Sequence, residues 1–129
     1  MLERIIAPGG AAPRGPYSHA VRAGDLIFVS GQGPVDPATG QGKLGDVASE
    51  TRLTLENIRT ILRACGADVT DVVKCGVFLS DIRDFAAMNP IYAEFFGDNK
   101  PARTTVQALL PLQGSKVEID CVAYKPVKA

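Results

Sequence analysis

Arg103 and Glu118 are the two residues whose types could together act on a small charged molecule. An arginine can hold a planar carboxylate through two parallel hydrogen bonds, and a glutamate can accept a proton from an attacking water. If the last two predicted strands form a hairpin centred between Leu110 and Pro111, Arg103 lies directly opposite Glu118 on one sheet face. The spacing alone favours a structural ion pair on a solvated face over a catalytic pair, because most such pairs are structural.

Composition limits the classes of protein that this chain can represent. It has 129 residues, of which 46% are hydrophobic, which suits one ordinary domain and is not typical of disorder. We therefore predict a single domain over residues 1–129. The 14 lysine and arginine residues equal the 14 aspartate and glutamate residues in number. Because nucleic-acid binders usually carry a basic excess, no nucleic-acid partner is expected.

The cysteines and the single histidine give no signature of a metal site. Cys65, Cys75 and Cys121 are odd in number and show no Cys-x-x-Cys spacing, and His19 has no companion at metal-ligand spacing. The apolar run at residues 5–7 is too short for a signal peptide, and no segment approaches the ~20 apolar residues of a membrane helix. We expect a cytoplasmic protein with reduced cysteines, no metal and no membrane association.

The first helix is predicted to begin after Asp46, whose carboxylate can cap its first turn. Leu55, Ile58 and Leu62 recur at helical spacing and form an apolar stripe. Gly66 then stands where a left-handed residue commonly ends a helix.

A strand is predicted at residues 71–80, and a helix is predicted after it. The apolar side chains expected on one face of the strand are those of Val73, Cys75, Val77 and Leu79. Pro90 disfavours a helix interior. We therefore predict a short turn at residues 85–88, then a helix with Asn89 as N-cap and Pro90 at its first position.

The complete predicted order is βββαβαββ. A short edge strand at residues 4–6 and a hairpin at residues 20–30 come first, and strands at residues 102–110 and 116–124 come last, joined across residues 111–114. This order indicates an α+β fold with two helices on one face of a mixed sheet. The opposite sheet face is too apolar to be left wet, so self-association is expected.

An ordered set of motifs along the chain resembles the RidA (YjgF) family. The motifs are Gly15-Pro16-Tyr17-Ser18, Ser30-Gly31-Gln32-Gly33-Pro34, Asn57, Asp81 with Phe85, Asn89, Tyr92-Ala93-Glu94-Phe95-Phe96, Pro101-Ala102-Arg103-Thr104 and Lys116-Val117-Glu118-Ile119. No single tetrapeptide is diagnostic, whereas the set in order and at compatible spacings is a strong signal. The resemblance implies a chorismate-mutase-like fold and a homotrimer with a site in each cleft between subunits.

The resemblance also implies an activity that needs no cofactor. Family members hydrolyse 2-imino acids, such as 2-iminopropanoate, 2-iminobutanoate and their enamine tautomers, to 2-oxo acids and ammonia. Carried over by position, Arg103 binds the substrate carboxylate and Glu118 orients the water. The other implied substrate contacts are Tyr17, Ser30, Gly31 and the backbone of Thr105, the first three from the neighbouring subunit. Tyr17 is also explained as an interface packing residue, and Ser30 as the end of a strand.

Three positions depart from the family pattern. Thr105 stands where the best-known deaminases have cysteine, Gly33 replaces a bulky aliphatic residue, and Arg14 replaces an apolar one. A roomier or more cationic cleft could change the preferred imino acid.

Two other functions compete with the deaminase hypothesis. One is an endoribonuclease acting on single-stranded RNA, an activity attributed to some relatives. Zero net charge, one histidine and no tryptophan argue against it. The other is a non-catalytic sensor that binds small carboxylates in the same cleft, which the sequence does not separate from an enzyme.

Overall fold

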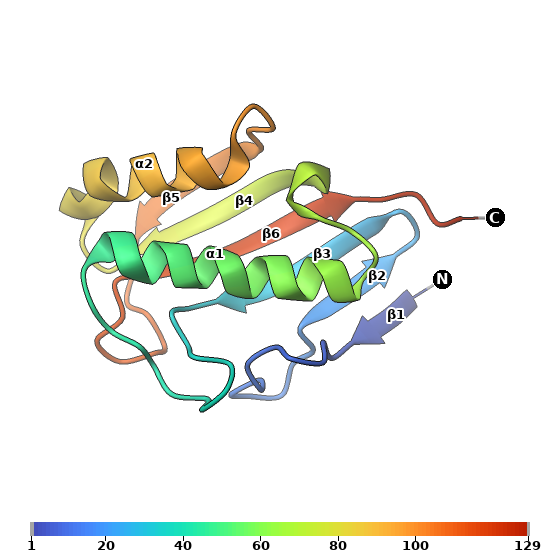
Figure 1. Ribbon diagram of the computed structural model, residues 1–129, viewed down its shortest axis with the longest axis horizontal. Coiled ribbons are helices and arrows are strands. Elements are labelled where there is room, and N and C mark those ends of the chain that lie inside the picture. Colours follow the sequence, from blue (N-terminus) through green and yellow to red (C-terminus); the bar gives the residue numbers. More distant parts are fainter. Residues whose placement is uncertain (1, 129) are drawn as a thin grey trace.

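The computed structural model describes residues 2–128 and shows two helices over one face of a six-stranded sheet (Figure 1). The elements are β1 (Leu2–Ile5), β2 (Ala20–Ala23), β3 (Leu26–Gln32), α1 (Val47–Ala64), β4 (Val72–Leu79), α2 (Phe85–Phe96), β5 (Ala102–Gln107) and β6 (Val117–Tyr124). Short 3-10 turns at Val69–Asp71 and Ile82–Asp84 precede β4 and α2. The predicted α+β class, the order βββαβαββ and the placement of both helices on one face are confirmed.

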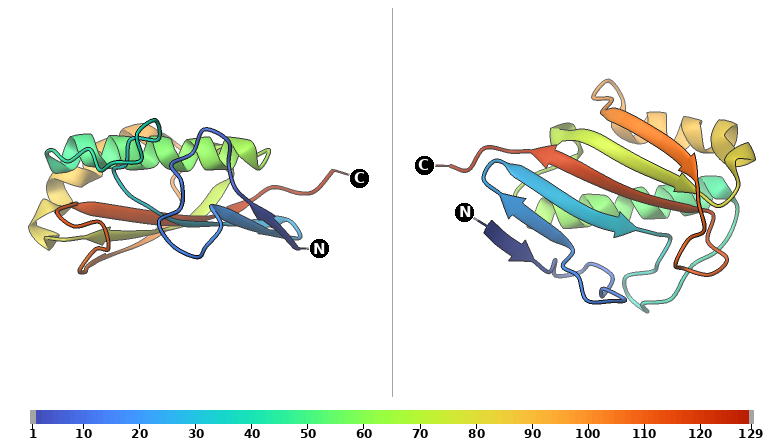
Figure 2. Two further views of the ribbon diagram at one scale, coloured as in Figure 1. Left: turned by 90° about the horizontal axis from the view of Figure 1, so that it is seen from below. Right: turned by 180° about the vertical axis from the view of Figure 1, so that it is seen from behind.

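The strands are arranged in the order β1-β2-β3-β6-β4-β5. All neighbours are antiparallel except β4 and β5, which run parallel because α2 carries the chain back between them. The predicted hairpin of the last two strands is therefore wrong. The connection after β5 takes the chain past β4, so β5 and β6 pair with opposite sides of that strand (Figure 2, right).

Helix α1 follows its sequence signals closely. The Asp46 side chain accepts a hydrogen bond from the Ser49 N–H at 2.7 Å and so caps the first turn. Leu55 and Ile58 are buried against the sheet, and Gly66 adopts φ +79° just beyond the helix, as the prediction requires.

Helix α2 begins earlier than predicted, because Pro90 lies inside it rather than at its start. A proline at this position leaves the Ala86 carbonyl without its helical N–H partner. Both residues are exposed, so water can hydrogen-bond that carbonyl and the helix continues. Asn89 is consequently not an N-cap but a residue in the middle of α2, and its side chain contacts Arg103 of β5.

Val73 of β4 faces away from the core, although it was predicted to lie on the same face as Cys75 and Val77. Val72 pairs with Ala123 and Lys74 with Val122, so Val73 is an extra, bulged residue in this strand. Val72 is consequently buried, at 6% exposure, whereas Val73 is 47% exposed. The inward positions of Cys75, Val77 and Leu79 are confirmed.

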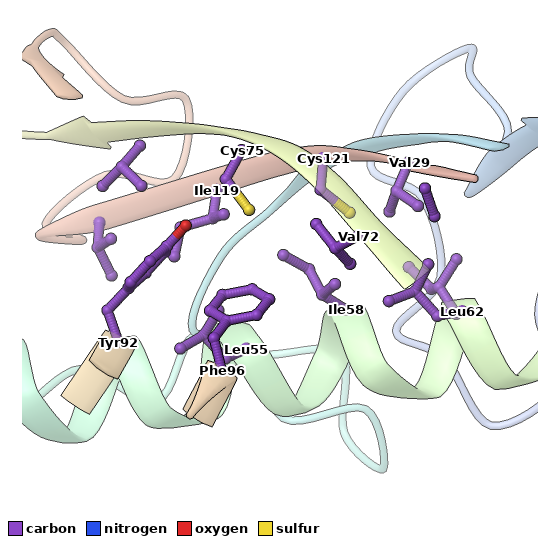
Figure 3. Packing of buried hydrophobic residues seen from close by; sticks show 14 of the residues in the cluster. Val29, Leu55, Ile58, Leu62, Val72, Cys75, Tyr92, Phe96, Ile119 and Cys121 are labelled. Atoms are coloured by element: carbon purple, nitrogen blue, oxygen red, sulfur yellow. The ribbon is translucent and has the colours of Figure 1, made fainter. Parts of the chain in front are cut away.

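The core lies between the helices and the sheet. Figure 3 shows Leu55 and Ile58 of α1 and Phe96 of α2 packed against strand residues such as Cys75 and Cys121. Both thiols are free and buried, and burial raises the pKa of Cys75 to about 11. Thiolate chemistry is therefore not available from this layer.

The other sheet face, called the open face here, carries no helix (Figure 2, left). Its exposed apolar side chains are Leu26, Phe28, Val73, Val106 and Tyr124. Within residues 2–128, no helix has both the length and the apolar character to cross a membrane.

Candidate functional site

The Glu118 carboxylate lies directly over the backbone of Gly31. These residues come from the neighbouring strands β6 and β3, whose register shifts between Val29 and Gln32. A Cβ atom at Gly31 would lie only 2.5 Å from Glu118 Oε2, so no other residue type fits without moving the glutamate. Burial, together with the nearby Asp120 carboxylate, raises the pKa of Glu118 above its ordinary value. A half-buried carboxyl with a raised pKa is suited to accept and then donate a proton.

A pocket of about 300 Å³ opens beside Glu118. Three segments that are distant in sequence form its wall: the loop after β1, the end of β3 with the residues following it, and the loop before β6 with the start of that strand. The pocket brings Tyr17, Gly31 and Glu118 together, three of the residues that the resemblance assigned to the site.

His19 holds the first of these segments in place. Its side chain is 1% exposed; Nδ1 accepts from the Ala7 N–H at 2.8 Å, and Nε2 lies 2.6 Å from the Ala11 carbonyl. Because the Ala7 N–H is a donor, Nδ1 must be unprotonated, and the ring proton is therefore assigned to Nε2. Both ring nitrogens have backbone partners, so His19 is a structural residue that shapes the pocket.

Tyr17 and Ser30 are placed differently with respect to the pocket. Tyr17 is 45% exposed, and its hydroxyl accepts from the Arg14 N–H at 3.2 Å. The Ser30 hydroxyl donates to the Ser18 carbonyl at 2.7 Å, which ties β3 to the segment before β2. Ser30 does not line the pocket beside Glu118; it borders a shallow hollow on the open face.

Arg103 lies in a second cluster, at the edge formed by β5 and α2. Its guanidinium carbon is 4.6 Å from the centre of the Tyr92 ring and 5.3 Å from that of Phe85. Nη2 donates to Asn89 Oδ1 at 2.9 Å. Stacking on two rings and one hydrogen bond fix the plane of the fork, while four of its five N–H donors are not used by Asn89. Such a cation is preorganised to bind a carboxylate.

The predicted pairing of Arg103 with Glu118 across a hairpin is wrong. Arg103 is aligned with Cys75, whose side chain faces the helices, whereas Glu118 is aligned with Phe78 on the open face. Within one chain the two residues therefore point to opposite sides of the sheet. Thr105 is aligned with the buried Val77 and so shares the side of Arg103.

The protein therefore carries two partial sites. One is a fixed cation on the helix side, and the other is the Glu118 carboxylate of the open face, which lies beside the pocket. The residues from 2 to 128 contain no group of three or more histidine, cysteine, aspartate or glutamate side chains placed to hold a metal ion.

Two asparagines contribute in ways that the sequence did not reveal. Asn89 fixes the Arg103 fork, but recognising this requires knowing that β5 lies along the side of α2. Asn57 is buried, and its amide donates to the Gly33 carbonyl at 3.1 Å and the Val35 carbonyl at 2.8 Å, fixing one pocket wall. A polar residue within the apolar stripe of α1 was the available signal for Asn57.

Comparisons with known proteins agree over nearly the whole chain. A family model described as Endoribonuclease L-PSP matches residues 9–125. A RutC family protein of Pyrococcus horikoshii, PH0854, is 46% identical over 125 residues, covering 97% of this chain and 99% of that protein. A human protein named 2-iminobutanoate/2-iminopropanoate deaminase is 43% identical over 129 residues, covering 97% of this chain and 92% of that protein. The crystal structure of E. coli TdcF with bound serine matches with a TM-score of 0.88 and 38% identity, over 95% of this chain and 99% of that one. Fold, motifs and matches together show that the chain belongs to the RidA (YjgF) family.

Proposed function

We propose that the protein hydrolyses small 2-imino acids, including 2-iminopropanoate and 2-iminobutanoate, to 2-oxo acids and ammonia without a cofactor. The observation that carries this proposal is the Glu118 carboxyl, which has a raised pKa and is held over Gly31 at the wall of a pocket. Addition of water to an electrophilic C=N carbon requires a positioned proton acceptor and little else. The name of the human relative as a 2-iminobutanoate/2-iminopropanoate deaminase supports the same reaction.

The reaction needs two proton transfers, and one carboxyl group can perform both. Water adds to the imino carbon and gives one proton to Glu118, which passes it to the nitrogen, forming a carbinolamine. Glu118 then moves the hydroxyl proton of the carbinolamine to the amino nitrogen, so that the carbonyl forms and the C–N bond breaks to release ammonia. The balance is R–C(=NH)–COO⁻ plus H₂O giving R–CO–COO⁻ plus NH₃. A carboxylate with a raised pKa is a stronger base, so Glu118 takes a proton from oxygen more readily in each of the two transfers.

The active site is proposed to form between two copies of the chain. Arg103 and Glu118 point to opposite sides of the sheet, so one copy cannot apply both residues to one small substrate. The exposed apolar residues of the open face give a second copy a surface to bury. In a homotrimer, Arg103 and the backbone of Thr105 from one subunit would face Tyr17, Gly31 and Glu118 of the next, closing three equivalent clefts. Ser30 would border the same interface.

Arg103 would then bind the carboxylate of the imino acid. Its fork is already oriented by Asn89 and by the Tyr92 ring, so little conformational freedom is lost on binding. The bound serine in the E. coli relative is itself a small amino acid that carries such a carboxylate.

Hydrolysis of freshly generated 2-iminopropanoate tests the proposal. An amino-acid oxidase would produce the imine from alanine, and the rate of imine loss and pyruvate formation would be compared with and without the protein. We expect acceleration by the parent protein, and a loss of roughly 10²–10⁴-fold in Glu118→Gln, the usual range for general acid–base catalysis. A parent protein that binds pyruvate without accelerating hydrolysis would instead be a carboxylate sensor. Salt-dependent cleavage of single-stranded RNA without imine hydrolysis would support the endoribonuclease named in the family description.

A further inference from the structure

The pocket beside Glu118 is larger than the simplest imino acids require. Its volume is about 300 Å³, within the range of pockets that enclose considerably larger ligands. Under the proposed function, the α-carboxylate is bound by Arg103 of a second subunit and the imino carbon lies at Glu118. The substrate side chain is then the part that extends into this pocket.

Two features set the shape and charge of the space available to that side chain. A Cβ atom at Gly33 would come no closer than 3.7 Å to any neighbour, the nearest being Leu112 Cδ2. Without a side chain, Gly33 therefore leaves room at this wall of the pocket. Among the described residues that line the pocket, Arg14 is the single lysine or arginine. The pocket therefore combines room beyond a methyl or ethyl group with one positive charge.

Arg14 is held by one contact within its own loop and one contact to another loop. Its backbone N–H donates to the Tyr17 hydroxyl at 3.2 Å, and its guanidinium Nη2 donates to the Gly40 carbonyl. The second contact joins the loop after β1 to the loop that follows β3. One donor of the fork is used in this way, which leaves the others for a ligand. A planar guanidinium positioned by the chain is suited to a second, distal carboxylate.

We propose that Arg14 is a specificity-determining residue and that the preferred substrates are 2-imino dicarboxylates, such as 2-iminoglutarate. This inference rests on the proposed function, because it assigns the two ends of the substrate relative to Arg103 and Glu118. A charge at each end of the substrate is matched by an arginine at each end of the cleft. The distal arginine also offsets the repulsion between a doubly charged substrate and the Glu118 carboxylate.

The test compares two substrates of equal chain length. 2-Iminoglutarate and 2-iminopentanoate, generated by an amino-acid oxidase from glutamate and norvaline, differ at the distal end, where one has a carboxylate and the other a methyl group. The ratio of their kcat/KM values is independent of how much of a preparation is active. We expect the parent to favour 2-iminoglutarate by at least about tenfold, and Arg14→Gln to lower that ratio by roughly 10- to 100-fold, as expected for loss of a hydrogen-bonded charge pair.

Two further variants complete the experiment. Arg14→Lys retains the charge without the fork and should give an intermediate ratio, which provides the test if Arg14→Gln does not fold. Arg63→Gln removes an exposed arginine in the last turn of α1, where it is paired with Asp68 and does not line the pocket. This variant should leave the ratio at the parent value.

Three outcomes would overturn the inference. A parent that hydrolyses 2-iminopropanoate but shows no preference for the dicarboxylate contradicts it and leaves the proposed function standing. The same holds if the Arg14 variants keep the parent ratio within about twofold, well inside the loss expected for a charged hydrogen bond. A parent that hydrolyses no 2-imino acid contradicts the proposed function and this inference together.

Discussion

Replacing Gly31 with alanine is expected to disable the site without unfolding the protein. The added Cβ would lie 2.5 Å from Glu118 Oε2, whereas ordinary contact begins near 3.4 Å. Gly31 is not among the glycines with positive φ, so its backbone can accept an alanine. The carboxylate lies at the end of a flexible side chain and should move, by about 1 Å or more, before the strand does.

A displacement of this size has a predictable effect on rate. Misplacing a catalytic group by about 1 Å costs on the order of 100-fold, so kcat/KM for 2-iminopropanoate should fall by about that factor. Overpacking costs about 1–3 kcal/mol, and thermal unfolding should show the corresponding decrease in Tm of a few degrees or more. Gly42→Ala is the matched control, because its Cβ would meet its nearest atoms, in Leu112, at 3.5 Å.

A double-mutant cycle separates the steric cause from other effects. In a Glu118→Ala background, Gly31→Ala should lose most of its stability cost, because the carboxylate that it strikes is gone. If Gly31→Ala is as active as the parent, the reasoning about the placement of Glu118 is refuted. An unchanged stability cost in the Glu118→Ala background would refute it as well.

Three further predictions concern residues around the two partial sites. Burial raises the pKa of Glu118, so ionisation of this carboxyl in the folded state opposes folding. The protonated carboxyl contributes full stability below its unfolded pKa. That stability is lost as the pH rises through the higher pKa of the folded state. Glu118→Gln should therefore raise Tm at neutral pH, and a gain that persists unchanged at acidic pH would contradict this linkage. His19→Leu should cost about 1–3 kcal/mol by leaving the Ala7 N–H unsatisfied, and His19→Gln should recover part of it; equal unfolding free energies of the two variants in urea would count against the assigned hydrogen bonds. Asn89→Ala should weaken pyruvate binding measured by calorimetry while the fold persists, because the Arg103 fork loses its fixed partner; parent affinity would show that the two rings orient the fork on their own.

The elements that were predicted correctly are those governed by local rules. The cap at Asp46, the stripe through Leu55 and Ile58, and the left-handed Gly66 each depend on residues within one or two helical turns. The strand predicted at residues 116–124 likewise depends on its own residues, and it is present as β6.

The errors arose where the outcome depends on distant partners. A hairpin was expected after residue 110 because adjacent strands usually pair, but β4 offered an open side to β6 once α2 had placed β5 on the other. The bulge at Val73 is set by pairing with β6, and the tolerance of Pro90 depends on its exposure to solvent. None of these partners can be read from the local sequence.

The candidate site follows the same division. The family motifs selected Arg103, Glu118 and Gly31 and implied a cleft between subunits, whereas the hairpin face expected to join Arg103 and Glu118 within one chain is wrong. Contacts that join distant segments, such as those of Asn57 and Asn89, became apparent only in the structure.

The most direct test of the central claim is complementation between two inactive variants. Arg103→Ala and Glu118→Gln would be co-expressed with different tags, the mixed oligomers purified, and 2-iminopropanoate hydrolysis measured against each variant alone. If each site takes Arg103 from one subunit and Glu118 from the next, each purified mixed trimer contains one cleft with both native residues and two without, so about one third of the parent activity should return. Mixed oligomers no more active than the separate variants would contradict an active site shared between subunits.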